Sequence, residues 1–207
     1  YGEPKKVPIL EDDETNPTNT YGETKLTMEK MMKWVNKANG IKFVSLRYFN
    51  VAGALEDGSI GEDHSPETHL IPLILQVPLK KREHITVFGD DYPTEDGTCI
   101  RDYIHVLDLA DAHIKALNYL RAGNESNIFN LGNGKGFSVK EMIDATKEAT
   151  GEEIKVVLGE RRVGDPAILI ASSEKAHNLL NWEPKYTNVK DIIKTAWTWH
   201  SKNPDGF

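Results

Sequence analysis

Residues 15–49, TNPTNTYGETKLTMEKMMKWVNKANGIKFVSLRYF, join a predicted helix to a predicted strand. Asn16 can cap a helix, and Pro17 suits the first helical position because that position needs no N–H donor. The following run is rich in Lys, Glu, Met and Leu and continues to about Gly40, which fits a C-terminal stop. IKFVSLRYF (41–49) is rich in β-branched and aromatic residues and is long enough for a buried strand.

The rest of the chain repeats this alternation of helix and strand. Further strands are predicted at ITVFG (85–89), NIFNLG (127–132) and IKVVLG (154–159). Helices are predicted at 69–81 with a break near Pro78, at 106–123, at 138–151 behind a Ser138–Glu141 capping box, and at 172–180 and 188–202. The apolar face expected for the helix at 106–123 consists of Leu107, Ala110, Ile114, Leu117 and Leu120. The alternation predicts an α/β fold.

Composition narrows the class of partner. The chain has 207 residues, of which 39% are hydrophobic and 28% charged, with a net charge of −7. No basic stripe could neutralise nucleic-acid phosphates, and no apolar run approaches the ~20 residues that span a bilayer, so neither nucleic acid nor membrane is expected as a partner. Cys99 is the single cysteine and cannot form an internal disulfide, which indicates a reducing cytoplasm.

Tyr21 and Lys25 stand four residues apart, which places them one above the other on one helix face. A phenol normally loses its proton near pH ~10, and an adjacent ammonium stabilises the phenolate. The pair therefore predicts a tyrosine that acts as acid or base near neutrality. The alternative is an ordinary helix with one aromatic side chain and one solvated lysine.

Other patterns carry less information by themselves. GNGKG (132–136) lacks both the dinucleotide and the phosphate-loop signatures, so a tight strand-to-helix turn is expected there. The seven histidines do not gather at metal-ligand spacing, and no metal site is expected. Arg101 precedes a helix, and RRVGDP (161–166) places Arg162 and Asp165 in a loop; arginine recognises phosphate, whereas surface ion pairs are the alternative.

Taken together, these motifs resemble one family. YGETK, SLRYFNVAGA, HLIP, FGDDYPTEDGTCIRDYIHVLDLADAH, NLGNGKGFSV, RRVGDP and NWEP occur in the order found in UDP-glucose 4-epimerases, which are extended short-chain dehydrogenase/reductases. The resemblance covers the whole chain. The Tyr–Lys spacing is general to the superfamily, whereas the segment around DYPTEDGT and RDYIHV is more specific and separates the epimerases from nucleotide-sugar dehydratases.

The resemblance implies an enzyme of carbohydrate metabolism that interconverts UDP-glucose and UDP-galactose by transient oxidation at C4, with bound NAD as cofactor. Tyr21 is implied as the acid/base, and Lys25 as the residue that assists it and binds the nicotinamide ribose. Arg101 and Arg162 would face the diphosphate, Phe88 the uracil and Asp165 the ribose. The implied UDP-hexose site consists of Asn50, Leu70, Phe88, Arg101, Arg162, Asp165 and Leu169. The family pairs through the Tyr–Lys helix, so a homodimer is implied for the complete protein.

The family also begins with a glycine-rich turn for the NAD pyrophosphate, which this sequence lacks. The resemblance therefore implies a C-terminal fragment, inactive alone. Residues 1–50 would be the end of a Rossmann-type doubly wound sheet, and residues 51–207 mainly a smaller α/β substrate domain with short returns to that sheet. Two alternatives stay open, namely another nucleotide-sugar 4-epimerase and a UDP-sugar-binding module without catalysis. Leu169 stands where the family borders the 2-substituent of the hexose, and leucine leaves room for an acetamido group; a buried strand residue is the alternative.

Overall fold

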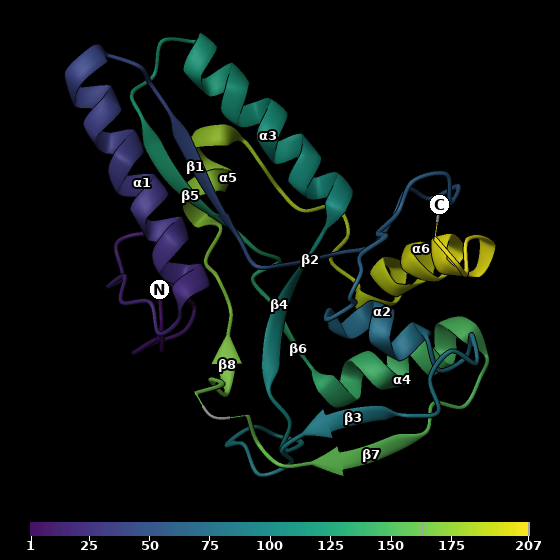
Figure 1. The fold of residues 1–207 in the computed structure, drawn as a ribbon. Coiled ribbons are helices and arrows are strands. Elements are labelled where there is room, and N and C mark those ends of the chain that lie inside the picture. The colour runs from purple at the N-terminus through teal and green to yellow at the C-terminus, as the bar shows by residue number, and fades with distance from the viewer. Residues whose placement is uncertain (163, 207) are drawn as a thin grey trace.

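The computed structural model describes residues 1–162 and 164–206 as helices and short strands in alternation (Figure 1). The helices are α1 (Thr20–Asn39), α2 (Leu70–Leu75), α3 (Val106–Arg121), α4 (Val139–Thr150), α5 (Glu174–Leu180) and α6 (Val189–Lys202). The strands are β1 (Val44–Tyr48), β2 (Asn50–Ala52), β3 (Ile85–Phe88), β4 (Ile100–His105), β5 (Asn127–Leu131), β6 (Gly136–Ser138), β7 (Val156–Gly159) and β8 (Ile168–Leu169). The α/β class predicted from the sequence is confirmed.

The first helix begins three residues later than the Asn16–Pro17 pattern predicts. Asn19 is the N-cap, with an extended backbone, and its side-chain oxygen accepts the Gly22 N–H at 2.8 Å. Both asparagines are cap-type residues, so sequence alone does not choose between them. The predicted end is correct, because Gly40 adopts the left-handed conformation with φ 71° and donates its N–H to Asn36.

Most strand pairs are parallel. β1 pairs with β5, β2 with β4, and β3 with β7, whereas β4 lies antiparallel to β6 and parallel to β8. An isolated bridge joins Ile9 to Ala171. The parallel β1–β5 pair lies between α1 on one side and α3 with α5 on the other, as helices cover both faces of a doubly wound sheet (Figure 1).

The buried face of α3 is not the face that the sequence predicts. The buried residues are Asp108, Leu109, Ala112 and Ala116, whereas Ile114 is 61% and Leu117 is 48% exposed. The helix carries two apolar stripes. The buried stripe contains the carboxylate of Asp108, so the sequence pattern does not mark it as a buried face. Asp108 accepts the backbone N–H groups of Lys185 and Tyr186, each at 3.0 Å, so its burial is compensated by hydrogen bonds.

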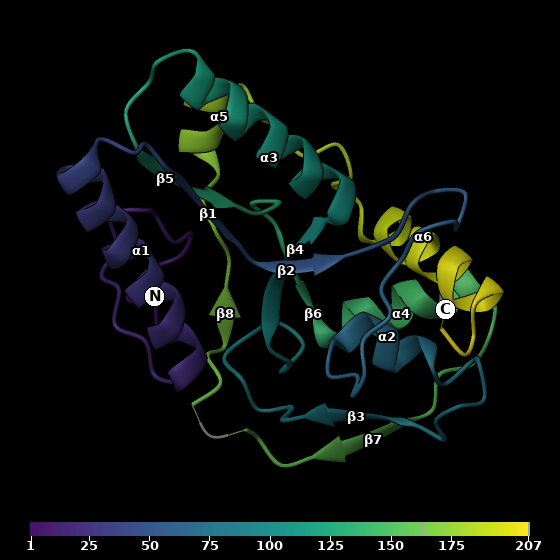
Figure 2. The ribbon, with the colours of Figure 1, turned by 45° about the horizontal axis from the view of Figure 1, so that its top comes forward.

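Two apolar cores lie on either side of β4. One core is built from α2, α4, α6 and β3, and includes Ile74, Leu75, Met142, Ile192 and Ile193. The other joins α3, β5 and α5, and includes Phe129, Leu131 and Trp182. Figures 1 and 2 both show α1 on the opposite side of β4 from α2, α4 and α6. Side chains from both groups of elements can therefore meet along β2, β4 and β8.

Candidate functional site

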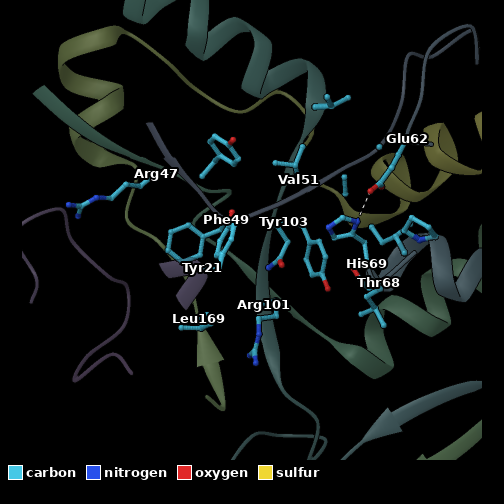
Figure 3. Close-up of a pocket in the computed structure, with 18 of the residues that line it drawn as sticks. Tyr21, Arg47, Phe49, Val51, Glu62, Thr68, His69, Arg101, Tyr103 and Leu169 are labelled. Carbon is cyan, nitrogen blue, oxygen red and sulfur yellow. Dashed lines mark ion pairs between the residues drawn. The ribbon is translucent and has the colours of Figure 1, made fainter. Parts of the chain in front are cut away.

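A large cavity lies where these two groups of elements meet, and its volume is about 1630 Å³ (Figure 3). Every side chain expected from the sequence to be catalytic, cofactor-binding or substrate-binding lines this cavity. These side chains are Tyr21, Lys25, Asn50, Leu70, Phe88, Arg101, Arg162, Asp165 and Leu169. They come from α1, β2, α2, β3, β4, β8 and the loop between β7 and β8, so the fold gathers residues that are up to 148 positions apart (169 − 21).

Tyr21 and Lys25 occupy the first two turns of α1 and lie on one face of it. The Lys25 ammonium lies over the Tyr21 ring, 5.2 Å from its centroid, which is a cation–π contact. Tyr21 is 71% exposed, so a ligand in the cavity can reach it. The pairing predicted from the four-residue spacing is therefore present.

A buried ion pair fixes this helix against β1. Arg47 of β1 donates from Nε and Nη2 to the two oxygens of Glu29 of α1, each at 2.7 Å, and Ser45 Oγ donates to Glu29 Oε1 at 3.0 Å. Burial acts to raise the pKa of Glu29, but the hydrogen bonds and charge of Arg47 outweigh it and hold that pKa below its usual value. The sequence motifs do not predict this pair, because Glu29 lies among other charged residues of an apparently solvated helix.

Arg101 and Asp165 form an ion pair on the cavity wall. Arg101 Nη1 also donates to the Ile100 carbonyl at 2.8 Å, and the side chain is only 13% exposed. Leu169 of β8 is the strand partner of Arg101 in β4, so the two residues are held side by side. Figure 3 shows Leu169 and Arg101 together on the same side of the cavity.

Arg162 and Phe88 form a second cation–π pair, with the guanidinium carbon 4.2 Å from the ring centroid. Gly89 follows Phe88 with φ +85°, and a Cβ there would approach Tyr92 to 2.8 Å and Arg161 to 2.9 Å. A glycine is thus required where the FGDDY segment turns back on the RRVGDP loop. The turn brings a planar ring and a cation to the same part of the cavity.

The sequence did not predict strand β4, whose interior carries Asp102 and His105. Asp102 is fully buried and accepts backbone N–H groups from Asn133 at 2.7 Å, Ala171 at 3.1 Å and Gly134 at 3.3 Å. Burial raises the pKa of Asp102 to about 6, against the effect of these donors. Asp102 therefore fixes the GNGKG turn, and Ala171 just after β8, to the strand that carries Arg101. The turn leads from β5 into the short strand β6 and not directly into a helix as the sequence predicts.

Leu70 is the first residue of α2, and Asn50 of β2 donates to the Asp102 carbonyl at 3.0 Å. Immediately before Leu70, His69 lies within 2.6 Å of Glu62 and 3.1 Å of Glu67. The His64 and His69 rings lie 4.9 Å apart, so the expectation that the histidines do not gather is wrong for these two. Sequence spacing could not reveal this, because the loop must fold back before Glu62 meets His69.

Comparison with known proteins gives concordant matches. A model of the NAD dependent epimerase/dehydratase family matches residues 1–132. A UDP-glucose 4-epimerase of Lacticaseibacillus casei is 60% identical over 207 residues, which is the whole of this chain and 62% of that protein. The chain thus spans less than two thirds of the length of that relative.

Solved structures agree with this match. A crystal structure of a UDP-glucose 4-epimerase superimposes with a TM-score of 0.98 at 59% identity, over all of this chain and 63% of that one. The UDP-Glc/GlcNAc 4-epimerase of Campylobacter jejuni gives a TM-score of 0.81 at 46% identity, over 97% of this chain and 61% of that one. The family model, the sequence identity to curated relatives and the superposition on solved structures agree. This chain belongs to the NAD dependent epimerase/dehydratase family.

Proposed function

We propose that this chain is the C-terminal part of a UDP-glucose 4-epimerase, which interconverts UDP-glucose and UDP-galactose through transient oxidation at C4 of the hexose. The observation that carries the proposal is the convergence of all the family-implied side chains on one cavity. That cavity exceeds the roughly 300–1,000 Å³ that is usual for one small ligand, which fits a nucleotide sugar beside a dinucleotide. The relatives support the same activity.

The cofactor implied by the family is NAD, and the donors at the N-terminal end of α1 fit it. Tyr21 contributes a hydroxyl and Lys25 an ammonium to the cavity wall, and both groups suit the hydroxyls of a nicotinamide ribose. When bound, NAD supplies the removal and return of hydride at C4. The donors of residues 1–50 hold only one part of such a ligand, so the pyrophosphate contacts are assigned to the preceding part of the protein.

Tyr21 is the proposed acid/base. Its phenolate oxygen takes the proton from the 4-hydroxyl of the hexose and becomes a hydroxyl, which returns the proton when the sugar hydroxyl re-forms with the opposite configuration. The Lys25 ammonium, 5.2 Å from the ring centroid, places a positive charge beside the phenolate and stabilises it before it accepts the proton.

The two arginines are assigned to the substrate diphosphate. A guanidinium offers five N–H donors, so Arg101 can keep its ion pair with Asp165 and still donate to phosphate. Arg162 already stacks on Phe88, and the uracil is assigned to the same ring. Asp165 accepts from the ribose hydroxyls, and Asn50 and Leu70 contact the hexose side. These roles place positive charge at the diphosphate and acceptors at the sugar hydroxyls.

We further propose that the enzyme accepts UDP-N-acetylglucosamine. Leu169 lines the cavity beside Arg101 and is half-buried, and a leucine at the border of the 2-substituent leaves room for an acetamido group. The relative from Campylobacter jejuni, whose name covers both Glc and GlcNAc substrates, supports this range.

The proposed domain division assigns residues 1–50 to the cofactor domain and residues 51–207 mainly to the substrate domain. The pairing of β5 with β1, the Ile9–Ala171 bridge and the packing of α5 on β5 support short returns of the later segment to the first sheet.

A homodimer is proposed for the complete protein. Met28, Met31 and Val35 on α1 are 54%, 61% and 42% exposed, and they line a shallow groove of about 270 Å³ with Met32, Ile41 and Phe43. An apolar groove of this kind favours contact with another protein surface.

The proposed compartment is the cytoplasm, which the single free thiol of Cys99 supports. In the part of the chain that the structure describes, no helix has both the length and the apolar character to cross a bilayer.

The test incubates the complete protein once with UDP-galactose and once with UDP-glucose. NMR of the anomeric protons monitors the conversion in each case. We expect both directions to proceed to the same equilibrium mixture. Binding of the UDP-hexose without any conversion would favour the alternative of a binding module. Conversion of a UDP-uronic acid but not of UDP-galactose would favour another nucleotide-sugar 4-epimerase.

A further inference from the structure

Two histidines and two glutamates meet in the loop between β2 and α2. They are Glu62, His64, Glu67 and His69, which we name the loop cluster. One nitrogen or oxygen from each side chain lies within 4.8 Å of all the others. Glu62 and Glu67 are half-buried, whereas both histidines are exposed to solvent on one side.

The distances within the cluster bracket the edge of a small coordination tetrahedron. Zinc binds nitrogen and carboxylate oxygen at about 2.0–2.2 Å, which puts neighbouring ligand atoms about 3.4 Å apart. Nδ1 of His69 lies 2.6 Å from Glu62 Oε1 and 3.1 Å from Glu67 Oε1, and Nδ1 of His64 lies 3.4 Å from Glu67 Oε1. To reach that spacing, the His69–Glu62 pair would open by about 0.8 Å and the His69–Glu67 pair by about 0.3 Å.

The donor set matches a divalent transition metal in chemistry and in charge. Imidazole nitrogen favours zinc and its neighbours over magnesium or calcium, and carboxylates complete such sites. Two neutral imidazoles and two carboxylates carry a charge of −2, which one divalent cation neutralises.

Contacts outside the cluster hold its two ends in place. A Cβ on Gly61 would approach the Trp199 ring to 2.1 Å, so only glycine permits this close packing on α6. Trp199 Nε1 then donates to the Glu62 carbonyl at 2.9 Å. At the other end, Glu67 Oε1 accepts the backbone N–H groups of Thr68 and His69, each at 2.7 Å. These bonds occupy the two lone pairs of Oε1, so Glu67 can keep them and offer its other oxygen, Oε2, to a cation.

We propose that the loop cluster binds one Zn²⁺ ion, with one ligand from each of Glu62, His64, Glu67 and His69. Four protein ligands make a closed, structural site rather than a catalytic one. The ion would fix the loop that leads into α2, and thereby the position of Leu70 on the cavity wall. This proposal does not depend on the proposed function.

The alternative is that the cluster is only a group of His–Glu ion pairs. The molecule contains such a pair as an internal control. On α5, His177 Nδ1 lies 3.0 Å from Glu183 Oε1, and both side chains are more than half exposed. His177 offers the same two residue types, and among the described residues it belongs to no group of three or more ligand side chains.

The experiment uses the complete protein after treatment with a chelator, titrated with Co²⁺ and followed in the visible spectrum. Tetrahedral Co²⁺ has intense absorption bands that octahedral Co²⁺ lacks, so the spectrum reports the coordination directly. We expect one equivalent to bind with a Kd of about 1 µM or tighter, and Zn²⁺ to displace it. His64→Gln is the principal variant, because His64 does not line the cavity, and Glu62→Gln is the second.

Each ligand variant should weaken Co²⁺ binding by about tenfold or more and remove the tetrahedral bands, whereas His177→Gln should change neither. Circular dichroism of each chelated variant checks that it is folded. The proposal is overturned if the unmodified protein shows no saturable tetrahedral spectrum. It is equally overturned if both folded ligand variants bind Co²⁺ as the unmodified protein does, or if His177→Gln weakens binding as much as they do.

Discussion

Replacing Glu29 with glutamine tests how α1, and with it Tyr21, is held against β1. The Glu29 carboxylate accepts from Arg47 Nε and Nη2 at 2.7 Å each and from Ser45 Oγ at 3.0 Å. Glutamine keeps the volume but loses the charge and turns an amide N–H₂ toward the guanidinium donors. Breaking one partner of a fully buried ion pair costs about 3–5 kcal/mol. Because the Glu29 and Arg47 side chains are 10% and 16% exposed, we expect a loss of about 2–4 kcal/mol.

The pH dependence of this loss has a definite sign. Although burial opposes it, the interaction with Arg47 leaves the pKa of folded Glu29 below the ordinary value of 4.5. The stabilisation is therefore complete above pH 4.5 and disappears as the pH falls through the lower folded value. The difference in stability between the unmodified protein and Glu29→Gln should shrink over the same range.

The assay is urea denaturation of the complete protein at neutral pH and at a series of acidic pH values. Glu23→Gln is the control on the same helix, because Glu23 is 57% exposed and its ion pair with Lys30 is long at 3.9 Å. We expect that control to lose no more than about 1 kcal/mol, from the first-turn helix dipole and a weak surface pair. A loss below about 1 kcal/mol in Glu29→Gln, or a loss independent of pH, would refute the reasoning.

Three further predictions concern the cavity and the α1 surface. Leu169→Tyr should reduce kcat/KM for UDP-N-acetylglucosamine by about tenfold or more and leave that for UDP-glucose within about threefold; equal effects on both sugars, or no N-acetyl activity in the unmodified enzyme, would contradict the steric role. Arg162→Ala should raise the Kd for UDP measured by calorimetry by about tenfold or more, since it removes charge-assisted bonds and the contact with Phe88; an unchanged Kd would remove Arg162 from the diphosphate site. Met31→Lys, which places a charge in the apolar groove of α1, should shift the complete protein from dimer to monomer in analytical ultracentrifugation, whereas the exposed Lys30→Glu should not; a dimer that survives Met31→Lys would move the interface elsewhere.

Local signals in the sequence predicted the elements whose ends are set by local chemistry. Gly40 ends α1 in the left-handed conformation, and Ser138 with Glu141 forms the capping box of α4 in both directions. These features depend on residues within one turn of each other, so sequence spacing is sufficient to predict them.

Elements whose stability depends on distant partners were not predictable in this way. Strand β4 was missed because Asp102 and His105 look incompatible with a buried strand. Their partners lie far along the chain, since Asp102 is bound by Ala171 and Asn133, while His105 Nε2 lies 2.9 Å from Thr195 Oγ1. Strands β6 and β8 are too short to show a hydrophobic period.

The candidate site shows the same division. Tyr21 and Lys25 follow from helical spacing, and Arg101, Arg162 and Asp165 from the chemistry of their residue types, whereas the other cavity residues were expected only through the family resemblance. The Glu29–Arg47 pair and the loop cluster carry no sequence signal, because each joins residues that meet only after the chain has folded.

The central claim is that Tyr21 exchanges the proton of the sugar 4-hydroxyl in an epimerase. The direct measurement compares the unmodified complete protein with Tyr21→Phe, using steady-state conversion of UDP-galactose and calorimetric binding of UDP. We predict that kcat falls by about 10²-fold or more while the Kd for UDP stays within about threefold, since phenylalanine removes the hydroxyl and leaves the arginines in place. A Tyr21→Phe variant that turns over UDP-galactose at nearly the unmodified rate would contradict the account.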